Sequence, residues 1–158
     1  NIFENEDIAI ELDTDALLPS DYIKSDTERF AFYKKLYNVR KRPDLEIIIE
    51  ELSDRFGKLP KEAEELVFAV QLRVASIPTG FTRVSLNKDK LIAEFPPETN
   101  KLYYENAFPE ITDYIQELDG AKLREGRKKL ILEKIMSSRD EAIEIMWKIG
   151  KTTEMVSD

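Results

Sequence analysis

Hydrophobic and polar residues alternate along the chain in patterns that predict short strands between helices. Ile8, Ile10 and Leu12 fall on every second position across residues 6–13, and this period of two predicts a strand with one buried face. Later alternation predicts two hairpins: residues 81–86 with 90–95 around Asn87-Lys88-Asp89, and residues 122–125 with 128–133 around Gly126.

Helical spacing of apolar residues accounts for most of the remaining chain. Helices are predicted from Ser25 or Asp26 to about residue 40, from 43 to 56, from Pro60 to about 77, weakly at 98–104 and 108–118, and after Ser138. In the first helix, Ser25 and Glu28 have capping-box spacing, and an aromatic-rich face is predicted from Phe30, Tyr33, Leu36 and Tyr37. Gly57 is expected to end the second helix, because glycine reaches the left-handed conformation at low cost.

This mixture of elements predicts the α+β class, with residues 1–158 as a single domain. We expect a small mixed or antiparallel sheet of about five strands, packed with about five or six helices. The residues from about 151 to 158 are polar enough to form a flexible tail. Asn1 stands where a complete product would carry methionine, so we expect a piece of a larger protein.

Composition narrows the classes of function. The chain has no cysteine, so it has no disulfide, thiolate metal site or cysteine nucleophile, which is compatible with the reducing cytoplasm. It also has no histidine, the most common general acid or base and zinc ligand, so a Ser-His-Asp triad is impossible. No apolar run approaches the roughly 20 residues of a membrane-spanning helix. We therefore expect a non-catalytic cytoplasmic domain without a cofactor or metal.

The net charge of -8 favours a basic protein surface as partner over a nucleic acid. Two basic clusters, Arg40-Lys41-Arg42 and Arg127-Lys128-Lys129, oppose this trend, but neither contains interleaved aromatic residues. The first lies at a predicted helix end and the second beside a hairpin turn, where cations have structural uses. DNA contact through Arg40-Lys41-Arg42 stays one alternative. Another is a carboxylate-based hydrolase, which would need a deep pocket and a carboxyl group of shifted pKa.

The end of the second predicted helix carries an acidic pair. Leu52 and Phe56 are four residues apart and point inward, whereas Glu51 and Asp54 are neighbours on the helix surface. Two carboxylates there repel each other and lie at the unfavourable end of the helix dipole, and Arg55 relieves this only in part. The pattern indicates that a basic partner faces the pair. A solvated acidic face is the simpler alternative.

The same stretch resembles a motif of the transcription-repair coupling factor family, whose C-terminal domain carries Glu-Leu-x-Asp-Arg-Phe-Gly-x-Leu-Pro. The motif is complete from Glu51 to Pro60, with Ser53 at a variable position. Residues 16–23, Ala-Leu-Leu-Pro-Ser-Asp-Tyr-Ile, resemble the family segment A-x-L-P-x-x-Y/F-I. Residues 29–35 resemble R-L-x-F-Y-K-R, with Phe30 for Leu and Lys35 for Arg. The resemblance covers about the first 80 residues; from Phe81 onward no motif is evident.

The resemblance implies a regulatory domain of a bacterial, ATP-driven DNA translocase that removes stalled RNA polymerase and recruits excision repair. Such a domain packs on the module of its parent that is homologous to UvrB, and masks the surface that UvrA binds. UvrA and RNA polymerase are then indirect partners, with no direct nucleic acid, no membrane and a monomeric state. The implied interaction residues are Glu51, Asp54 and Arg55. The implied structural residues of the motif are Leu52, Phe56, Gly57, Leu59 and Pro60.

Overall fold

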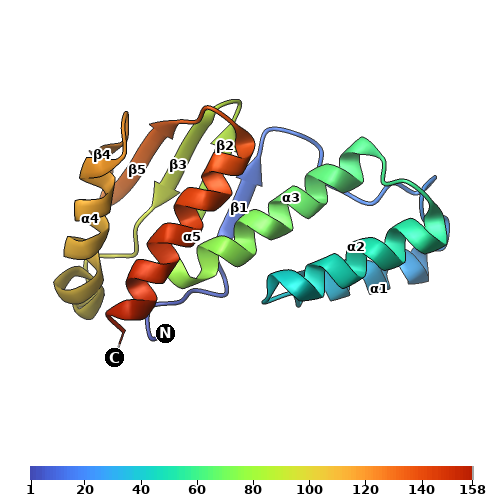
Figure 1. The fold of residues 1–158 in the computed structure, drawn as a ribbon, viewed down its shortest axis with the longest axis horizontal. Coiled ribbons are helices and arrows are strands. Elements are labelled where there is room, and N and C mark those ends of the chain that lie inside the picture. The colour runs from blue at the N-terminus through green and yellow to red at the C-terminus, as the bar shows by residue number, and fades with distance from the viewer. Residues whose placement is uncertain (158) are drawn as a thin grey trace. The chain divides into compact units, whose positions relative to one another are not determined.

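Five strands form one mixed sheet in the computed structural model, which describes residues 1–157 (Figure 1). They are β1 (Ala9–Leu12), β2 (Arg83–Asn87), β3 (Lys90–Glu94), β4 (Lys122–Gly126) and β5 (Lys129–Ile135). The order across the sheet is β1-β2-β3-β5-β4; β1 runs parallel to β2, and the other neighbouring pairs are antiparallel. The predicted α+β class, with a small mixed sheet of about five strands, is confirmed.

Helices account for most of the remaining described residues. They are α1 (Asp26–Tyr37), α2 (Arg42–Phe56), α3 (Lys61–Ser76), α4 (Phe108–Glu117) and α5 (Arg139–Met155), with a 3-10 turn at Ile77–Thr79 and a π-helix at Tyr103–Ala107. The chain divides into two compact units. One comprises Asn1–Asp13 and the chain from Ala75 onward, and the other comprises Thr14–Val74, which is inserted in the sequence between β1 and β2. No helix in the described part of the chain has the length and apolar character needed to cross a membrane.

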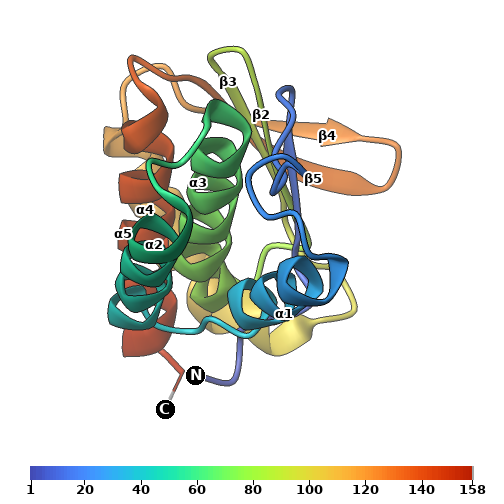
Figure 2. The ribbon, with the colours of Figure 1, turned by 90° about the vertical axis from the view of Figure 1, so that its right-hand side faces the viewer.

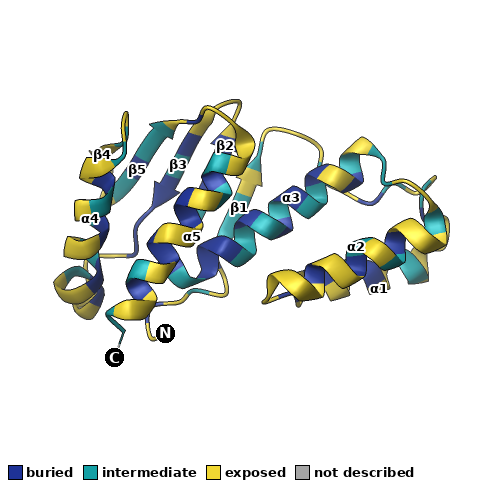
Figure 3. Cartoon of the chain, viewed as in Figure 1, coloured by how far each residue is buried: buried dark blue, intermediate teal, exposed yellow. Residues whose placement is uncertain are grey.

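The core of the sheet unit follows from strand pleating. Val84, Leu91, Ala93 and Leu132 have no exposed surface and share one face of the sheet by register. Helices α4 and α5 lie on one side of the sheet, as the view along its edge shows (Figure 2). The buried side chains therefore face these helices, and α5 contributes Ile145 and its other buried residues to the same core (Figure 3).

The opposite face of the sheet carries ion pairs. Glu94 lies between Arg83 and Lys129, with N–O distances of 2.9 and 2.8 Å. Glu133 lies 2.5 Å from both the Lys90 and the Arg124 nitrogen atoms, and the hydrogen bond from Lys90 holds the pKa of this carboxyl group below its usual value. These cations therefore neutralise carboxylates that the sheet has largely withdrawn from water.

Helix α1 differs from its prediction. Of the predicted aromatic-rich face, Leu36 is buried and Tyr33 packs against the core, whereas Phe30 and Tyr37 are exposed. Phe32, which was not part of that face, is buried beside Leu36. The helix also ends at Tyr37 rather than near residue 40. Apolar side chains occur on several sides of α1, and local spacing alone does not show which of them meet the core.

The C-terminal part also departs from the expected boundaries. The second hairpin turns at Arg127-Lys128, and Gly126 is the last residue of β4. Helix α5 continues to Met155 and buries Thr153, so residues 151–155 extend the helix instead of forming a separate tail. The last position of the expected tail, residue 158, lies outside the described residues.

We predict that Gly80→Ala destabilises the sheet unit more than Gly120→Ala does. Both glycines have a positive φ, of 81° and 77°, so alanine is strained at either site by about 1 kcal/mol. At Gly80 an added Cβ would also lie 2.6 Å from the Tyr103 ring and 2.9 Å from the Phe3 carbonyl oxygen, whereas at Gly120 it meets nothing within 4 Å. Overpacking adds about 1–3 kcal/mol, measurable by urea unfolding. Equal losses would contradict the packing at Gly80.

We also predict a pH-dependent contribution from Glu141. Its carboxylate accepts hydrogen bonds from the Ser137 hydroxyl and backbone N–H and pairs with Lys134, which together lower its pKa from 4.5 to about 2. A pKa lowered by folding stabilises the protein above the unfolded value and loses that effect as pH falls. The loss of stability caused by Glu141→Gln should therefore shrink between about pH 4.5 and pH 2 in urea unfolding. A loss that stays constant over this range would contradict the assignment.

Candidate protein-interaction surface

Helix α2 buries one line of side chains and so fixes the direction of the others. Leu45, Ile48 and Leu52 are buried in the core of the inserted unit, and Phe56 packs against it. Gly57 ends the helix, as predicted, and its N–H bonds the Ser53 carbonyl oxygen at 3.0 Å. Its φ of 87° is positive, but its ψ of -170° differs from the left-handed helical conformation that the prediction assumed. Because Leu52 and Phe56 point inward, the side chains of Glu51 and Asp54 point away from the core.

The end of α2 is held by contacts to the segment that precedes α1. The Tyr22 hydroxyl donates to the carbonyl oxygens of Leu52 and Gly57, at 3.2 and 2.8 Å. The Phe56 ring meets Tyr22 and Phe32 edge-on, with ring centroids 5.8 and 5.7 Å apart. These contacts fix the position of the last turn of α2, and with it the acidic pair.

The two remaining motif residues lie in the connection to α3. Leu59 is half-buried against the core of the inserted unit. The Pro60 carbonyl oxygen accepts bonds from the N–H groups of Ala63 and Glu64 at 3.0 Å, which start the helix. All five residues that the resemblance marks as structural therefore occupy packing or turn positions.

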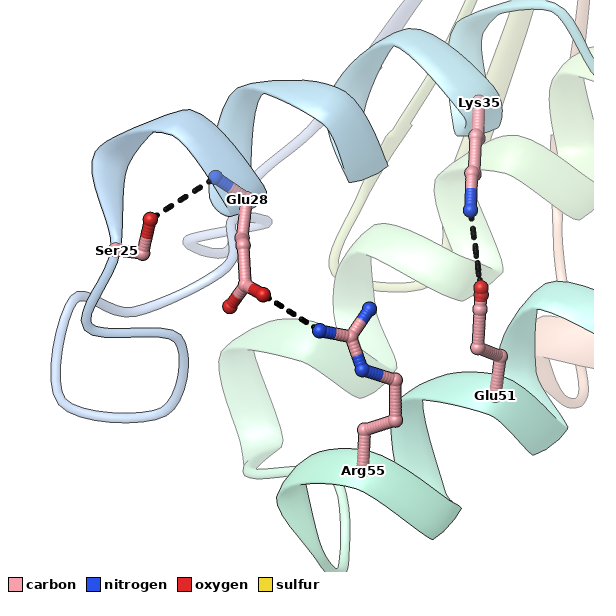
Figure 4. Close-up of polar contacts among 5 residues, drawn as sticks. All are labelled: Ser25, Glu28, Lys35, Glu51 and Arg55. Carbon is pink, nitrogen blue, oxygen red and sulfur yellow. Dashed lines mark hydrogen bonds and ion pairs between the residues drawn. The ribbon is translucent and has the colours of Figure 1, made fainter.

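Glu51 and Asp54 have different surroundings in the structure. Lys35 of α1 donates to both carboxylate oxygens of Glu51, at 2.9 and 3.2 Å (Figure 4). Arg55 was expected to reduce the repulsion between Glu51 and Asp54. Its side chain instead pairs with Glu28 of α1 at 2.6 Å. Glu28 therefore does not complete a capping box. Its backbone N–H bonds the Ser25 hydroxyl, as predicted, but its carboxylate is occupied by Arg55.

The carboxylate of Asp54 has no partner among the described residues. It is exposed, and no described residue between 1 and 157 forms a hydrogen bond or ion pair with its side chain. Glu51 is 32% exposed, so its carboxylate is also reachable from solvent while it is paired with Lys35. We call Glu51 and Asp54 together the acidic face. Arg55 forms part of the α1–α2 connection and is less available to a partner.

Sequence reasoning missed Lys35 and Glu28 as partners of the motif. They lie 16 and 27 positions from the residues they bind, so no helical spacing connects them. Only the packing of α1 against α2 could have indicated these pairs. The repulsion argued from the sequence is accordingly smaller than expected at Glu51 and persists at Asp54.

Neither alternative function gains support from the corresponding residues. Arg40 donates to the carbonyl oxygens of Tyr37 and Val39, at 3.0 and 3.1 Å, which satisfies the end of α1, and Arg42 lies 3.9 Å from Glu46. For a hydrolase, the carboxyl groups with shifted pKa are Glu133 and Glu141, and both are shifted downward. A group of lowered pKa stays ionised near neutral pH and is unsuited to donate a proton.

A depression of about 450 Å³ adjoins the motif between the end of α2 and the start of α3. It is lined by Ile49, Ser53, Lys58, Leu59, Glu64 and Val67. Glu64 is the one carboxylate in this lining, so the depression does not gather the pair of carboxyl groups that glycoside hydrolysis requires.

Comparisons with known proteins agree with this motif. The sequence profile of the family described as the TRCF domain matches residues 12–106. The chain is 40% identical over 84 residues to a transcription-repair-coupling factor of Staphylococcus epidermidis and 37% identical over 82 residues to one of Mycobacterium bovis. These matches cover 53% and 52% of the chain and 7% of each relative, so the chain spans a small part of their length.

The fold is shared over nearly the whole chain. A crystal structure of the C-terminal domain of transcription-repair coupling factor superimposes with a TM-score of 0.70, covers 96% of both chains and is 21% identical in sequence. At this identity the likeness concerns the fold alone. The region after residue 106, which the family profile does not match, therefore keeps the architecture without a recognisable sequence motif.

We predict that the Lys35–Glu51 pair contributes only about 0.5 kcal/mol to stability, because both side chains are partly exposed. A double-mutant cycle with Lys35→Ala, Glu51→Ala and the double variant, measured by urea unfolding, gives this coupling free energy. A coupling above about 2 kcal/mol would show that Glu51 is needed for the fold, and substitutions there could then not be read as effects on binding.

Proposed function

The chain belongs to the TRCF domain family, and from this membership and the acidic face we propose that it is a non-catalytic regulatory domain of a transcription-repair coupling factor. In this proposal the domain packs on the UvrB-homology module of its parent and masks the surface that UvrA binds. The observation that carries the proposal is Asp54, whose charge is held outward beside Glu51 and is unused within the described chain.

The acidic face suits arginine side chains of a partner. Carboxylates form short, charge-assisted hydrogen bonds with guanidinium groups, and the two oxygens of one carboxylate can accept a bidentate pair. Both carboxylate oxygens of Asp54 are available to a partner. Those of Glu51 already accept hydrogen bonds from Lys35, so a partner would share them with Lys35 or displace Lys35. Close charge pairs across protein interfaces couple by roughly 1.5–7 kcal/mol. Asp54 is therefore the stronger of the two contacts in this proposal.

Tethering explains how a small acidic face can close a mask. When both surfaces belong to one chain, their effective concentration reaches about millimolar, so a modest intrinsic affinity suffices. Opening then requires a competing state that gains more free energy, such as engagement of the parent with RNA polymerase. A contact built on partly exposed charges is suited to such a release, because it is specific without being very strong.

We predict that Asp54→Lys in the full-length parent raises its affinity for UvrA, and that Glu51→Lys does so to a smaller extent. Each substitution places a cation opposite the proposed basic surface and opens the mask. UvrA binding by titration calorimetry measures the effect, and urea unfolding checks that the fold is intact.

Asp119→Lys provides the matched control, since it reverses an exposed acid in the turn after α4, outside the motif. It should leave UvrA affinity unchanged. Equal increases for Asp119→Lys and Asp54→Lys would indicate a general effect of net charge. Unchanged affinity for both motif variants would refute the proposed mask.

A further inference from the structure

Ile47 is a large apolar residue on the solvent side of α2. Its neighbours Leu45 and Ile48 are buried, but Ile47 is 65% exposed. The core of the inserted unit does not use it, and a β-branched residue in the middle of a helix is a poorer choice than alanine, leucine or glutamate. Exposed apolar residues are common, and Ile47 differs from the others by its place beside the motif.

The position of Ile47 connects it to the acidic face. Residues 47, 51 and 54 are spaced i, i+4 and i+7, which places them within about 60° of one another around the helix. Glu50 is exposed and lies one turn after Ile47 on the same outer side. Ile47 is thus an apolar side chain bordered by carboxylates, on the side of α2 opposite its buried line.

An apolar residue surrounded by charged ones is the usual arrangement of a protein interface. The centre of such an interface is apolar and loses its water on binding, while polar groups form the rim and set orientation. Ile47 beside Glu51 and Asp54 fits this arrangement, with the isoleucine at the centre and the carboxylates at the rim.

We propose that Ile47 is the apolar anchor of the docking surface formed with Glu51 and Asp54. The partner surface would then combine basic side chains with an apolar depression that receives Ile47. This inference rests on the proposed function and specifies its partner: the module must offer a mixed apolar and basic surface, and a uniformly basic patch would not fit.

The anchor and the acidic face should respond differently to salt. Burial of an aliphatic side chain depends on apolar area and is little affected by ionic strength, whereas pairs of partly exposed charges are screened. Truncating Ile47 at Cβ should lower the equilibrium constant for docking on the module by about tenfold. When the docked state predominates, the affinity of the parent for UvrA rises by the same factor.

Phe30 offers a matched control. It is also 65% exposed, and it lies in the same inserted unit on α1. Around α1 it is about 140° from Lys35 and 160° from Glu28, the two residues that bind α2, so it points away from the acidic face. Phe30→Ala removes as much exposed apolar character from the unit without touching the proposed surface.

The test measures UvrA affinity of the full-length parent, at low and high salt, for the wild type, Ile47→Ala, Phe30→Ala and Asp54→Lys. Ile47→Ala should raise the affinity about tenfold at both salt concentrations, and the increase caused by Asp54→Lys should shrink at high salt. Phe30→Ala should have no effect. Urea unfolding of Ile47→Ala should show unchanged or slightly higher stability, because alanine favours the helix.

An increase with Asp54→Lys but none with Ile47→Ala would overturn the anchor and leave the proposed function standing. Equal increases with Ile47→Ala and Phe30→Ala would also overturn it, since the effect would not depend on the surface. If no variant raises the affinity, the mask itself is wrong and the anchor with it.

Discussion

The burial of Leu52 is the constraint on which the interaction surface depends. Leu52 has no exposed surface, and Phe56, one turn later, packs against the same core. With these two side chains directed inward, helical geometry leaves Glu51, Asp54 and Ile47 on the outer side. Tyr22 binds the backbone at both Leu52 and Gly57, so the last turn of α2 cannot rotate without losing these bonds.

Ion pairs between α1 and α2 change how much negative charge that surface presents. Lys35 neutralises part of Glu51, and Glu28 removes Arg55 from the vicinity of Asp54, so one carboxylate is shared and the other is free. A partner cation gains fully at Asp54 and only partly at Glu51. In the proposed function, this balance favours a contact of moderate strength, from which the domain could be released.

The sequence predicted the parts of this structure that depend on local rules. Strand alternation located both hairpins, the end of α2 at Gly57 followed from the tolerance of glycine for a positive φ, and the inward direction of Leu52 followed from helical spacing. The side of α1 that meets the core could not be chosen, because apolar residues at 30, 32, 33, 36 and 37 offer more than one helically spaced set. The Lys35–Glu51 and Glu28–Arg55 pairs depend on how two helices pack, and no local pattern encodes them. Ile47 lies off the helical spacing of Leu45, Ile48 and Leu52, so helical geometry alone places it on the outer side of α2, but no sequence motif marked it as functional.

The most direct test of the acidic face is titration calorimetry of this chain with the purified UvrB-homology module of the same parent at two salt concentrations. If the acidic face is the contact, binding should weaken as salt rises and should be lost when Glu51 and Asp54 are both replaced by lysine. Binding that is insensitive to salt and survives this double replacement would contradict this prediction, because the contact would then lie elsewhere on the chain.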